Sequence, residues 1–368
     1  MKFVKTEDLK DGMRLAKPIY NKKGVLLYER DSKLTGQSIG SVRNFGLMGV
    51  YVLEPAEPLP PMSQEDIALE KFLTVSEFRL MDELTEMIKT GKSSKIRHLA
   101  DSYVSECGRM NLPVNFIQNL RGAEDYVVKH SSNVALLCAL LSRSMGLFLD
   151  EQKDAILAGL VHDVGKLNIP ATLMAQEELT EEERHEMRIQ ELHGADIIEG
   201  CFMSQPSIKR TMLQACKHIG AFENGEEQDG VKMVKTAKVL VVADMFDKLT
   251  AMSLQHEPMS YISALKFLMS NPDWFDKDVV KALVKCVSFL GEGTSVELSN
   301  GEKALVLATN PDNLLKPMVL MFSGNVIIDL ARTSVYEGLE VVDTMKTLDS
   351  RYVMDKESID RMKNEASV

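Results

Sequence analysis

Four side chains with the chemistry of metal ligands lie on three segments of the sequence: His130, the adjacent pair His162 and Asp163, and Asp244. Two imidazoles and two carboxylates form a mixed nitrogen and oxygen set, which suits Mn, Fe or Zn better than Ca or a thiolate-bound metal. Such an ion lowers the pKa of bound water and polarises a phosphoryl oxygen. The pattern therefore predicts one divalent transition metal and hydrolytic chemistry.

A lysine follows the His-Asp pair within about one helical turn. Lys166 is close enough to His162 to reach a substrate phosphate, where its ammonium would stabilise charge in the transition state. Each residue also has a simpler structural explanation. His130 alone is typical of a hydrogen-bonded core histidine, Asp244 of a helix cap, and Lys166 of a cation that offsets a helix dipole. The metal hypothesis depends on their occurring together.

The segment before the His-Asp pair has the periodicity of helices. Between 126 and 146 apolar residues recur at helical spacing, and His130 lies on the same inward stripe. A second apolar pattern at 157–164 carries His162 and Asp163 at its margin. The Ile169-Pro170 pair is expected to end that helix, because proline disfavours helical backbone in the residue before it.

The aspartate at 244 follows a wholly apolar run at 239–243. Its β-branched residues would suit a strand, but the helical surroundings favour a buried helix. Further upstream in this helical region, Thr180 to Glu183 has the pattern of a capping box at a helix N-terminus. Helices are therefore expected to position all four candidate ligands.

Composition and periodicity divide the chain into five segments and predict a mainly α fold. These are a small β-rich N-terminal domain at 1–53, a Pro-rich linker at 54–63, an all-helical core at 64–288, a small C-terminal β extension at 289–344 and a charged tail at 345–368. The N-terminal segment has a hairpin turn at 21–24 and a strand at 49–53. The extension has a hairpin at 294–309 and strands near 318–322 and 325–330.

The overall composition narrows the class of protein. The chain has 368 residues, a formal net charge of -11 and five scattered cysteines without a CxxC pair. The acidic balance argues against nonspecific DNA binding, and the cysteines are typical of reduced thiols in a cytoplasmic protein. No apolar run is long enough for a membrane span, and the first residues lack the pattern of a signal peptide.

Longer motifs around these residues resemble those of the HD-GYP family of metal-dependent phosphohydrolases. The string from Val161 to Pro170 is similar to HDxGKxxIP, Asp125 to Ser131 to DxYTxxHS, and Val239 to Thr250 to the segment that carries the family's aspartate ligand. Residues 1–53 and 290–330 resemble domains that often flank the family's core. The resemblance implies an HD-domain core, hydrolysis of cyclic di-GMP, and Lys166 and Asp163 as catalytic residues.

The sequence also departs from the family pattern. Gln190 stands where MKxHPxxGA has a histidine ligand, and His218-Ile219-Gly220 replaces HHE. The GYP tripeptide is missing from 221–230. The resemblance therefore implies that one metal site is retained, and that a second is degenerate at Gln190 and Ile219 with His218 as its remaining candidate ligand. His193 could substitute for the lost histidine, although a surface histidine is the simpler interpretation.

Two functions remain open from the sequence. The first is a degenerate cyclic di-GMP phosphodiesterase of bacterial second-messenger signalling. The second is a catalytically inactive HD-GYP-like module that binds a nucleotide or a protein partner as a signalling regulator. Retention of the four ligands and Lys166 argues against a third, metal-free structural regulator of the HDOD type. A nucleotide ligand is expected for the first function, and a homodimer is compatible with both.

Overall fold

The computed structural model describes most of the chain. The described residues are 2–20, 25–45, 47, 49–53, 64–93, 95–116, 118, 121, 125–174, 176, 180–227, 230, 232–251, 258–310, 313–332 and 338–344. The expected turn at 21–24, the linker at 54–63 and the tail at 345–368 lie outside them.

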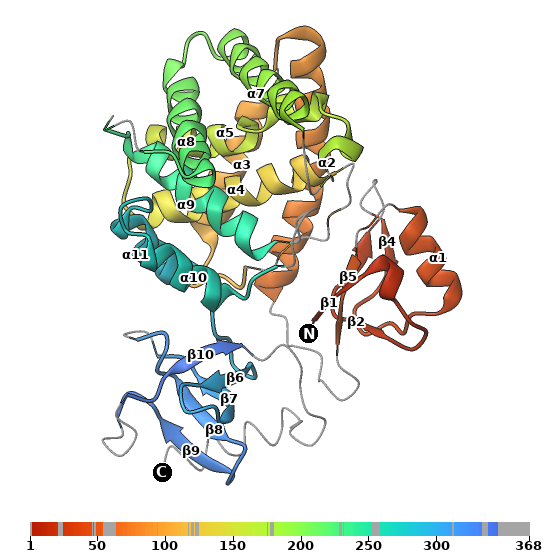
Figure 1. Cartoon of the computed structure of the whole chain (residues 1–368), viewed down its shortest axis with the longest axis vertical. Coiled ribbons are helices and arrows are strands. Elements are labelled where there is room, and N and C mark those ends of the chain that lie inside the picture. Colours follow the sequence, from red (N-terminus) through yellow and green to blue (C-terminus); the bar gives the residue numbers. More distant parts are fainter. Residues whose placement is uncertain are drawn as a thin grey trace.

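Helices dominate the described part, so the expected mainly α fold is confirmed (Figure 1). The helices are α1 (Gly36–Asn44), α2 (Gln64–Thr90), α3 (Ile96–Arg109), α4 (Tyr126–Ser144), α5 (Leu149–Val161), α6 (Ala171–Met174), α7 (Glu181–Cys201), α8 (Pro206–Asn224), α9 (Lys235–Thr250), α10 (Tyr261–Ser270) and α11 (Lys277–Cys286), with short 3-10 helices η1 (Thr6–Asp8) and η2 (Val164–Asn168).

The N-terminal residues form a small unit with its own apolar core. An antiparallel sheet has the order β1 (Lys2–Lys5), β5 (Gly49–Leu53), β2 (Arg14–Leu15), and β3 (Ile19–Tyr20) pairs antiparallel with β4 (Leu26–Tyr28). The predicted strand at 49–53 is confirmed as β5. Strand β1 and helix α1, which Thr35 caps by accepting from the Ser38 amide, were not expected. We call residues 2–53 the N-terminal unit.

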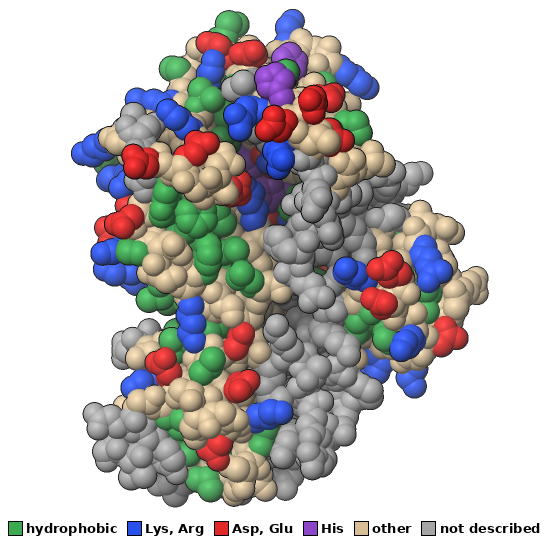
Figure 2. All heavy atoms as spheres, viewed as in Figure 1, with side chains coloured by type: hydrophobic (Ala, Val, Ile, Leu, Met, Phe, Trp, Pro, Cys, Tyr) green, Lys and Arg blue, Asp and Glu red, His purple; other side chains and the backbone are tan. Residues whose placement is uncertain are grey.

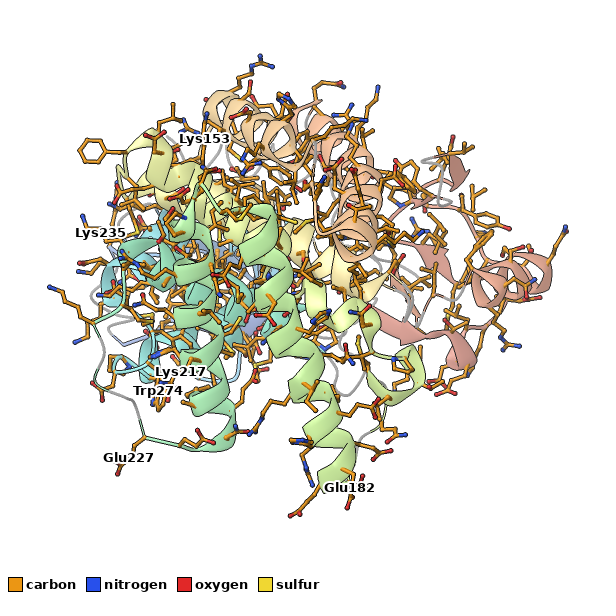
Figure 3. The ribbon with its side chains drawn as sticks, turned by 90° about the horizontal axis from the view of Figure 1, so that it is seen from above. Lys153, Glu182, Lys217, Glu227, Lys235 and Trp274 are labelled. Atoms are coloured by element: carbon orange, nitrogen blue, oxygen red, sulfur yellow. The ribbon has the colours of Figure 1, made fainter. Side chains whose placement is uncertain are left out.

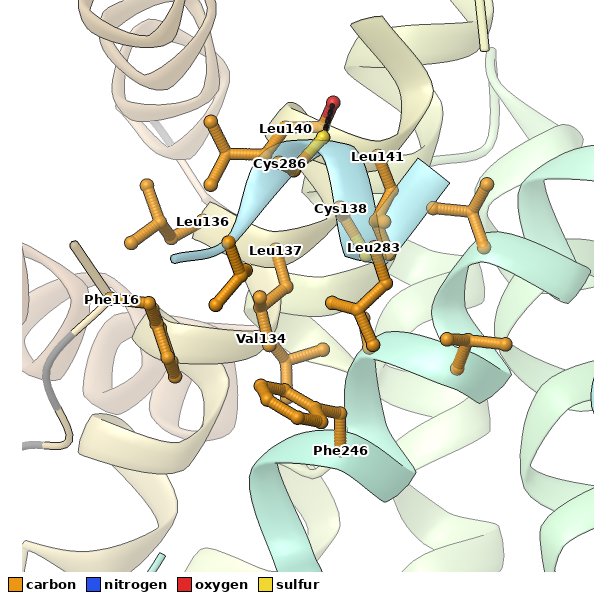
Figure 4. Close-up of a cluster of buried hydrophobic side chains, with 14 of the residues drawn as sticks. Phe116, Val134, Leu136, Leu137, Cys138, Leu140, Leu141, Phe246, Leu283 and Cys286 are labelled. Atoms are coloured by element: carbon orange, nitrogen blue, oxygen red, sulfur yellow. Dashed lines mark hydrogen bonds between the residues drawn. The ribbon is translucent and has the colours of Figure 1, made fainter. Parts of the chain in front are cut away.

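Helix α4 runs through the middle of the helical part and is buried along nearly its whole length. Its apolar side chains pack against those of α9 and α11, as Val134, Phe246 and Leu283 illustrate (Figure 4). Cys286 donates a hydrogen bond of 3.3 Å to the carbonyl of Leu140. The apolar run at 239–243 forms the buried part of helix α9, as predicted. These contacts fix the helices that carry the candidate ligands.

The helix before the His-Asp pair ends earlier than expected. Helix α5 ends at Val161, His162 is its C-cap, and the 3-10 helix η2 then runs to Asn168. The prediction that Ile169-Pro170 ends this helix was therefore wrong for α5, although the pair does follow η2. The chain leaves α-helical geometry after His162, so Asp163 lies between α5 and the tighter 3-10 helix η2. The capping box at Thr180 is confirmed at the start of α7.

The C-terminal β extension is an antiparallel sheet. Its strands are β6 (Ser295–Leu298), β7 (Lys303–Ala308), β8 (Met318–Met321), β9 (Val326–Asp329) and β10 (Val341–Thr344), in the order β10-β6-β7-β8-β9. The predicted hairpin forms β6 and β7, while β10 was not expected. One face of this sheet belongs to the same apolar core as the helices. Within the described residues, no helix is long and apolar enough to cross a membrane.

Candidate metal centre

Two imidazole rings meet in the interior of the helical part. His130 lies on α4 and His162 at the end of α5, and these two helices pack directly on each other. Their Nε2 atoms are 3.2 Å apart, and His130 is only 1% exposed. The burial of His130 agrees with its position on the inward stripe of its helix.

The other nitrogen of each ring faces a hydrogen-bond acceptor. Nδ1 of His130 is 2.6 Å from Oδ2 of Asp247, and Nδ1 of His162 is 2.9 Å from the carbonyl of Gly159. An ionised carboxylate and a carbonyl can only accept, so both Nδ1 atoms carry protons. In the neutral rings, each Nε2 therefore presents a lone pair to the other.

Two carboxylates approach the same point. Oδ1 of Asp244 is 2.8 Å from Nε2 of His130 and 3.5 Å from Nε2 of His162. Oxygens of Asp163 lie 3.6 Å from Nε2 of His130 and 3.7 Å from Nε2 of His162. Four acceptor groups thus converge, and they need a proton or a metal cation among them. His130, His162 and Asp163 place their ligand atoms within 4.8 Å of one another.

The protonation of His130 reports the same demand for positive charge. Burial lowers the pKa of His130, but hydrogen bonds with Asp244 and Asp247 outweigh it and raise the pKa above its ordinary value. The field that would hold a proton on Nε2 would equally favour a divalent cation there. Imidazole and carboxylate ligands therefore fit a transition metal at this point.

Two lysines neutralise the converging carboxylates. Nζ of Lys166 is 2.9 Å from Oδ1 of Asp163, and Nζ of Lys248 is 3.0 Å from Oδ2 of Asp244. Burial alone would raise the pKa of both carboxyl groups, but the lysines and histidines hold these pKa values well below their usual range. In turn Asp244 outweighs burial and raises the pKa of Lys248. Asp163, Asp244 and Lys248 are therefore charged near neutral pH.

A second layer of polar side chains surrounds Asp247, one helical turn after Asp244. Nη2 of Arg121 lies 2.7 Å and 2.8 Å from the two carboxylate oxygens, and Arg121 is fully buried. Burial raises the pKa of Asp247, but Arg121 and His130 lower it to about 2. Three carboxylates and three cations thus balance in the centre: Asp163, Asp244, Asp247, Arg121, Lys166 and Lys248.

The surface over the helical part is hollowed. Figure 2 shows the hollow with histidine and with lysine or arginine side chains in view inside it. Lys166 and Lys248 keep 23% and 24% of their side-chain surface exposed, whereas the histidines and aspartates beneath them are buried. Lys166 and Lys248 thus lie at the exposed side of the cluster.

Comparisons with known proteins show what the chain is similar to. The family model of the HD domain matches residues 115–279, which include the four candidate ligands. Cyclic di-GMP phosphodiesterase PA4108 of Pseudomonas aeruginosa is 26% identical over 227 residues, 61% of this chain and 53% of the relative. Residues 115–279 therefore match the HD domain, and the chain is similar to HD-GYP proteins.

Other proteins match shorter segments or at lower identity. The cyclic di-GMP phosphodiesterase response regulator RpfG of Xanthomonas campestris is 27% identical over 169 residues, 45% of this chain and 43% of the relative. The matches thus span about half of each of these two curated relatives. Among solved structures, Bd1817 of Bdellovibrio bacteriovorus, an HDG"Y"P protein, has a TM-score of 0.45 at 14% identity, covering 76% of this chain and 97% of that one.

The residues expected at a second metal site, His218, Ile219 and Gln190, have other surroundings than the four candidate ligands. Nε2 of His218 is 2.8 Å from the carbonyl of Trp274, and the two rings are in contact. Ile219 belongs to the apolar core. Helices α7 and α8 pack side by side (Figure 3). Gln190 is half-buried on α7, whose backbone lies against η2, and His193 is exposed.

Several polar residues of the centre were not identified from the sequence. They are Gln118, Arg121, Asn133, Asp247 and Lys248. Asp247 and Lys248 had one usable signal, since they lie three and four residues after Asp244 and so share its helix face. Gln118 and Arg121 lie outside regular helices, and nothing in their spacing connects them to an aspartate more than a hundred residues away.

Proposed function

We propose that the protein is a metal-dependent phosphohydrolase that acts on a cyclic di-GMP-like phosphodiester. The observation that carries the proposal is the convergence of two imidazole lone pairs with two carboxylates. His130, His162, Asp163 and Asp244 would hold one divalent ion, Mn, Fe or Zn. When bound, that ion would activate water and polarise a phosphoryl oxygen.

The charges of the centre favour an anionic substrate. The three carboxylates are paired with three cations, so a divalent ion held by the four ligands would add positive charge beside Lys166. Lys166 lies at the exposed side of the cluster, where it would contact the phosphate and stabilise the developing negative charge. Asp163 orients the ammonium of Lys166 through contacts of 2.9 Å and 3.0 Å. These two residues form the proposed catalytic pair.

The substrate class is supported by the named relatives, two of which are cyclic di-GMP phosphodiesterases. The corresponding role is in bacterial second-messenger signalling, and the proposed location is the cytoplasm, where free cysteines are usual. The second metal site is proposed to be degenerate, because His218 is engaged by Trp274 and Ile219 is in the core. One ion per chain is therefore expected.

The test combines metal analysis with a hydrolysis assay. Purified protein loaded with Mn, Fe or Zn should contain about one ion per chain, and should cleave cyclic di-GMP or bis(p-nitrophenyl) phosphate. His162→Ala and Asp163→Ala should each abolish binding and cleavage, whereas His193→Ala, at an exposed histidine outside the cluster, should change neither. A wild-type protein that takes up no metal would refute the proposal.

A second candidate function is a regulator that binds a nucleotide or a protein partner without turnover, alone or as a homodimer. The engaged His218 and the buried Ile219 favour it, because the symmetric clamp of a two-metal site would be lost. Metal-loaded protein that binds cyclic di-GMP in a calorimeter and leaves it intact would support this function over the first.

A further inference from the structure

A lysine of the N-terminal unit reaches into the helical part. Lys17 follows β2, is only 8% exposed, and donates a hydrogen bond from Nζ to the backbone carbonyl of Gln118. Its Nζ also lies 5.2 Å from the centroid of the Tyr51 ring, which belongs to β5 of the same unit. Burying an ammonium is costly unless it is hydrogen-bonded, so this contact fixes both partners.

The side chain of Gln118 uses all its hydrogen-bonding capacity. Its Nε2 donates to Oδ1 of Asp247 at 3.1 Å and to Oγ1 of Thr250 at 2.8 Å. Its Oε1 accepts from Arg121 at 3.1 Å and from Asn133 at 2.8 Å. An amide has two donors and two acceptor lone pairs, so no group is left over. A displaced backbone at this residue would break several buried hydrogen bonds together.

Asp247 carries the connection to the metal centre. Its Oδ1 accepts from Gln118, and its Oδ2 accepts the Nδ1 proton of His130. That proton fixes the tautomer and direction of the ring, and so directs the Nε2 lone pair at the cluster. Partners of this kind orient metal ligands and raise their basicity. An uninterrupted set of contacts therefore runs from Lys17 through Gln118 and Asp247 to His130.

We propose that Lys17 is a positioning residue through which the seating of the N-terminal unit sets the metal affinity of the centre. This rests on the proposed function only in taking the cluster as a metal site. When the N-terminal unit is seated, Lys17 holds the carbonyl of Gln118, and the amide holds Asp247 in line with His130. When the unit moves away, the carbonyl loses its donor and the ring loses its fixed direction.

The boundary between the two parts has space for such movement. A cavity of about 1490 Å³ lies there, lined from the N-terminal unit by Lys17, Ile19 and Phe45 and from the helical part by Glu70 and Gln118. A close-packed interface transmits no change without repacking, whereas a cavity lets one side shift. A movement of the N-terminal unit at this cavity would therefore change the Lys17 contact and, through Gln118 and Asp247, the orientation of His130.

The test begins with substitutions in the full chain. Lys17→Met keeps the length of the side chain and removes its donor, whereas Lys17→Arg keeps a cation that can donate. Arg14→Met is the matched control, because Arg14 belongs to the same unit but pairs with Asp31 within it. We expect Lys17→Met to weaken metal affinity on the order of tenfold, and the other two variants to stay near the wild type.

A spectroscopic measurement separates this inference from the proposed function. The Nδ1 proton of His130 is observable by NMR in metal-free protein, and its resonance should shift or broaden in Lys17→Met only. If wild-type protein binds no metal, the proposed function fails and this resonance still decides the role of Lys17. Unchanged affinity and an unchanged resonance in Lys17→Met would overturn the inference.

A double-mutant cycle tests the route. If Lys17 acts through Gln118, then Lys17→Met should add little to the loss in Gln118→Ala, in metal affinity or in the His130 resonance. Additive losses would overturn the route through Gln118. If Gln118→Ala does not fold, the comparison of Lys17→Met with Lys17→Arg decides, because only a positioning role is rescued by arginine.

Discussion

At the scale of residues, Asp247 is the carboxylate with the most hydrogen bonds described in the centre, and it pairs with the buried Arg121. It accepts hydrogen bonds from Gln118, Arg121, His130 and Asn133, and both it and Arg121 are fully buried. Among the residues that the structure describes, Nε and Nη1 of Arg121 have no hydrogen-bond partner, and its charge is paired with Asp247. A buried charge that loses its partner destabilises the fold strongly.

The first prediction is that Asp247→Asn lowers the free energy of unfolding by about 3–5 kcal/mol, because it leaves Arg121 buried and uncompensated. Urea unfolding followed by circular dichroism measures the loss. The double variant Asp247→Asn with Arg121→Met should recover much of it, since the uncompensated charge is then gone. A loss below ~1 kcal/mol in the single variant would show that Arg121 finds other compensation.

The sequence revealed the candidate ligands around the metal position but not the polar residues that orient these ligands. His130, His162, Asp163 and Asp244 stand out because ligand types recur on apolar helical patterns. Their role as ligands stays a prediction, although the structure brings the side chains together. Gln118 and Asn133 carry no such signal, because an amide becomes informative only through what lies within about 3 Å of it.

At the scale of elements, the position of η2 depends on a close backbone contact with α7. A Cβ on Gly165 would lie 2.2 Å from the carbonyl oxygen of Gln190, and one on Gly194 would lie 2.8 Å from the amide of Gly165. Only glycine fits this approach, which directs the chain between Asp163 and Lys166. The two glycines thus belong to the construction of the centre.

The second prediction is that Gly165→Ala destabilises the protein by about 1–3 kcal/mol, because η2 and α7 must separate to admit a methyl group. It should also weaken metal binding through displacement of Asp163. Gly220→Ala is the control, since its Cβ would meet open space in α8, and a helical alanine stabilises by about 0.5–1 kcal/mol. Thermal unfolding and metal titration of both variants check this, and equal stability would contradict it.

The third prediction concerns α2 and pH. Burial raises the pKa of Glu77 from 4.5 to about 7, although Lys129 opposes it. A pKa raised on folding gives stability that is complete below the unfolded value and is lost as pH rises through the folded value. Glu77→Gln should therefore be more stable than wild type at pH 8, by roughly 1–3 kcal/mol, and equal to it below pH ~4. An equal difference at both pH values would be inconsistent with this titration.

Helices with a clear apolar stripe were predicted well, and irregular elements were not. Helix α9 follows from its apolar run, and the start of α7 from its capping box. The end of α5 was misplaced because the apolar spacing continues into η2, where 3-10 geometry replaces α geometry. Helix α1 was missed because it is short and weakly apolar, although Thr35 and Ser38 form a capping pair.

At the scale of the whole molecule, the apolar residues fall into unequal cores. The N-terminal unit has its own cluster, which includes Leu15, Val42 and Val50. The helices and one face of the C-terminal sheet share another, which continues from α2 to β10. The division at 54–63 stays a prediction. The division near 289 also stays a prediction, and one apolar core extends across it.

The fourth prediction follows from these cores. A chain that begins at residue 62 should fold, whereas one that ends at residue 288 should aggregate, because it exposes the face that packs on the sheet. Gel filtration and circular dichroism of both truncations, with the full chain as reference, measure this. Aggregation of the first, or a monomeric and cooperatively unfolding second, would contradict the assignment.

Strand β10 has a consequence for how the protein is made. Residues 341–344 pair with β6, and Val341 lies in the core shared with the helices. During translation the ligands at 130, 162, 163 and 244 emerge long before this strand does. A ribosome-bound chain therefore holds every candidate ligand before the strand that completes the shared apolar core has been made. Chaperones and metal ions would therefore meet the ligands before the core is complete. The core can close only after β10 has been synthesised.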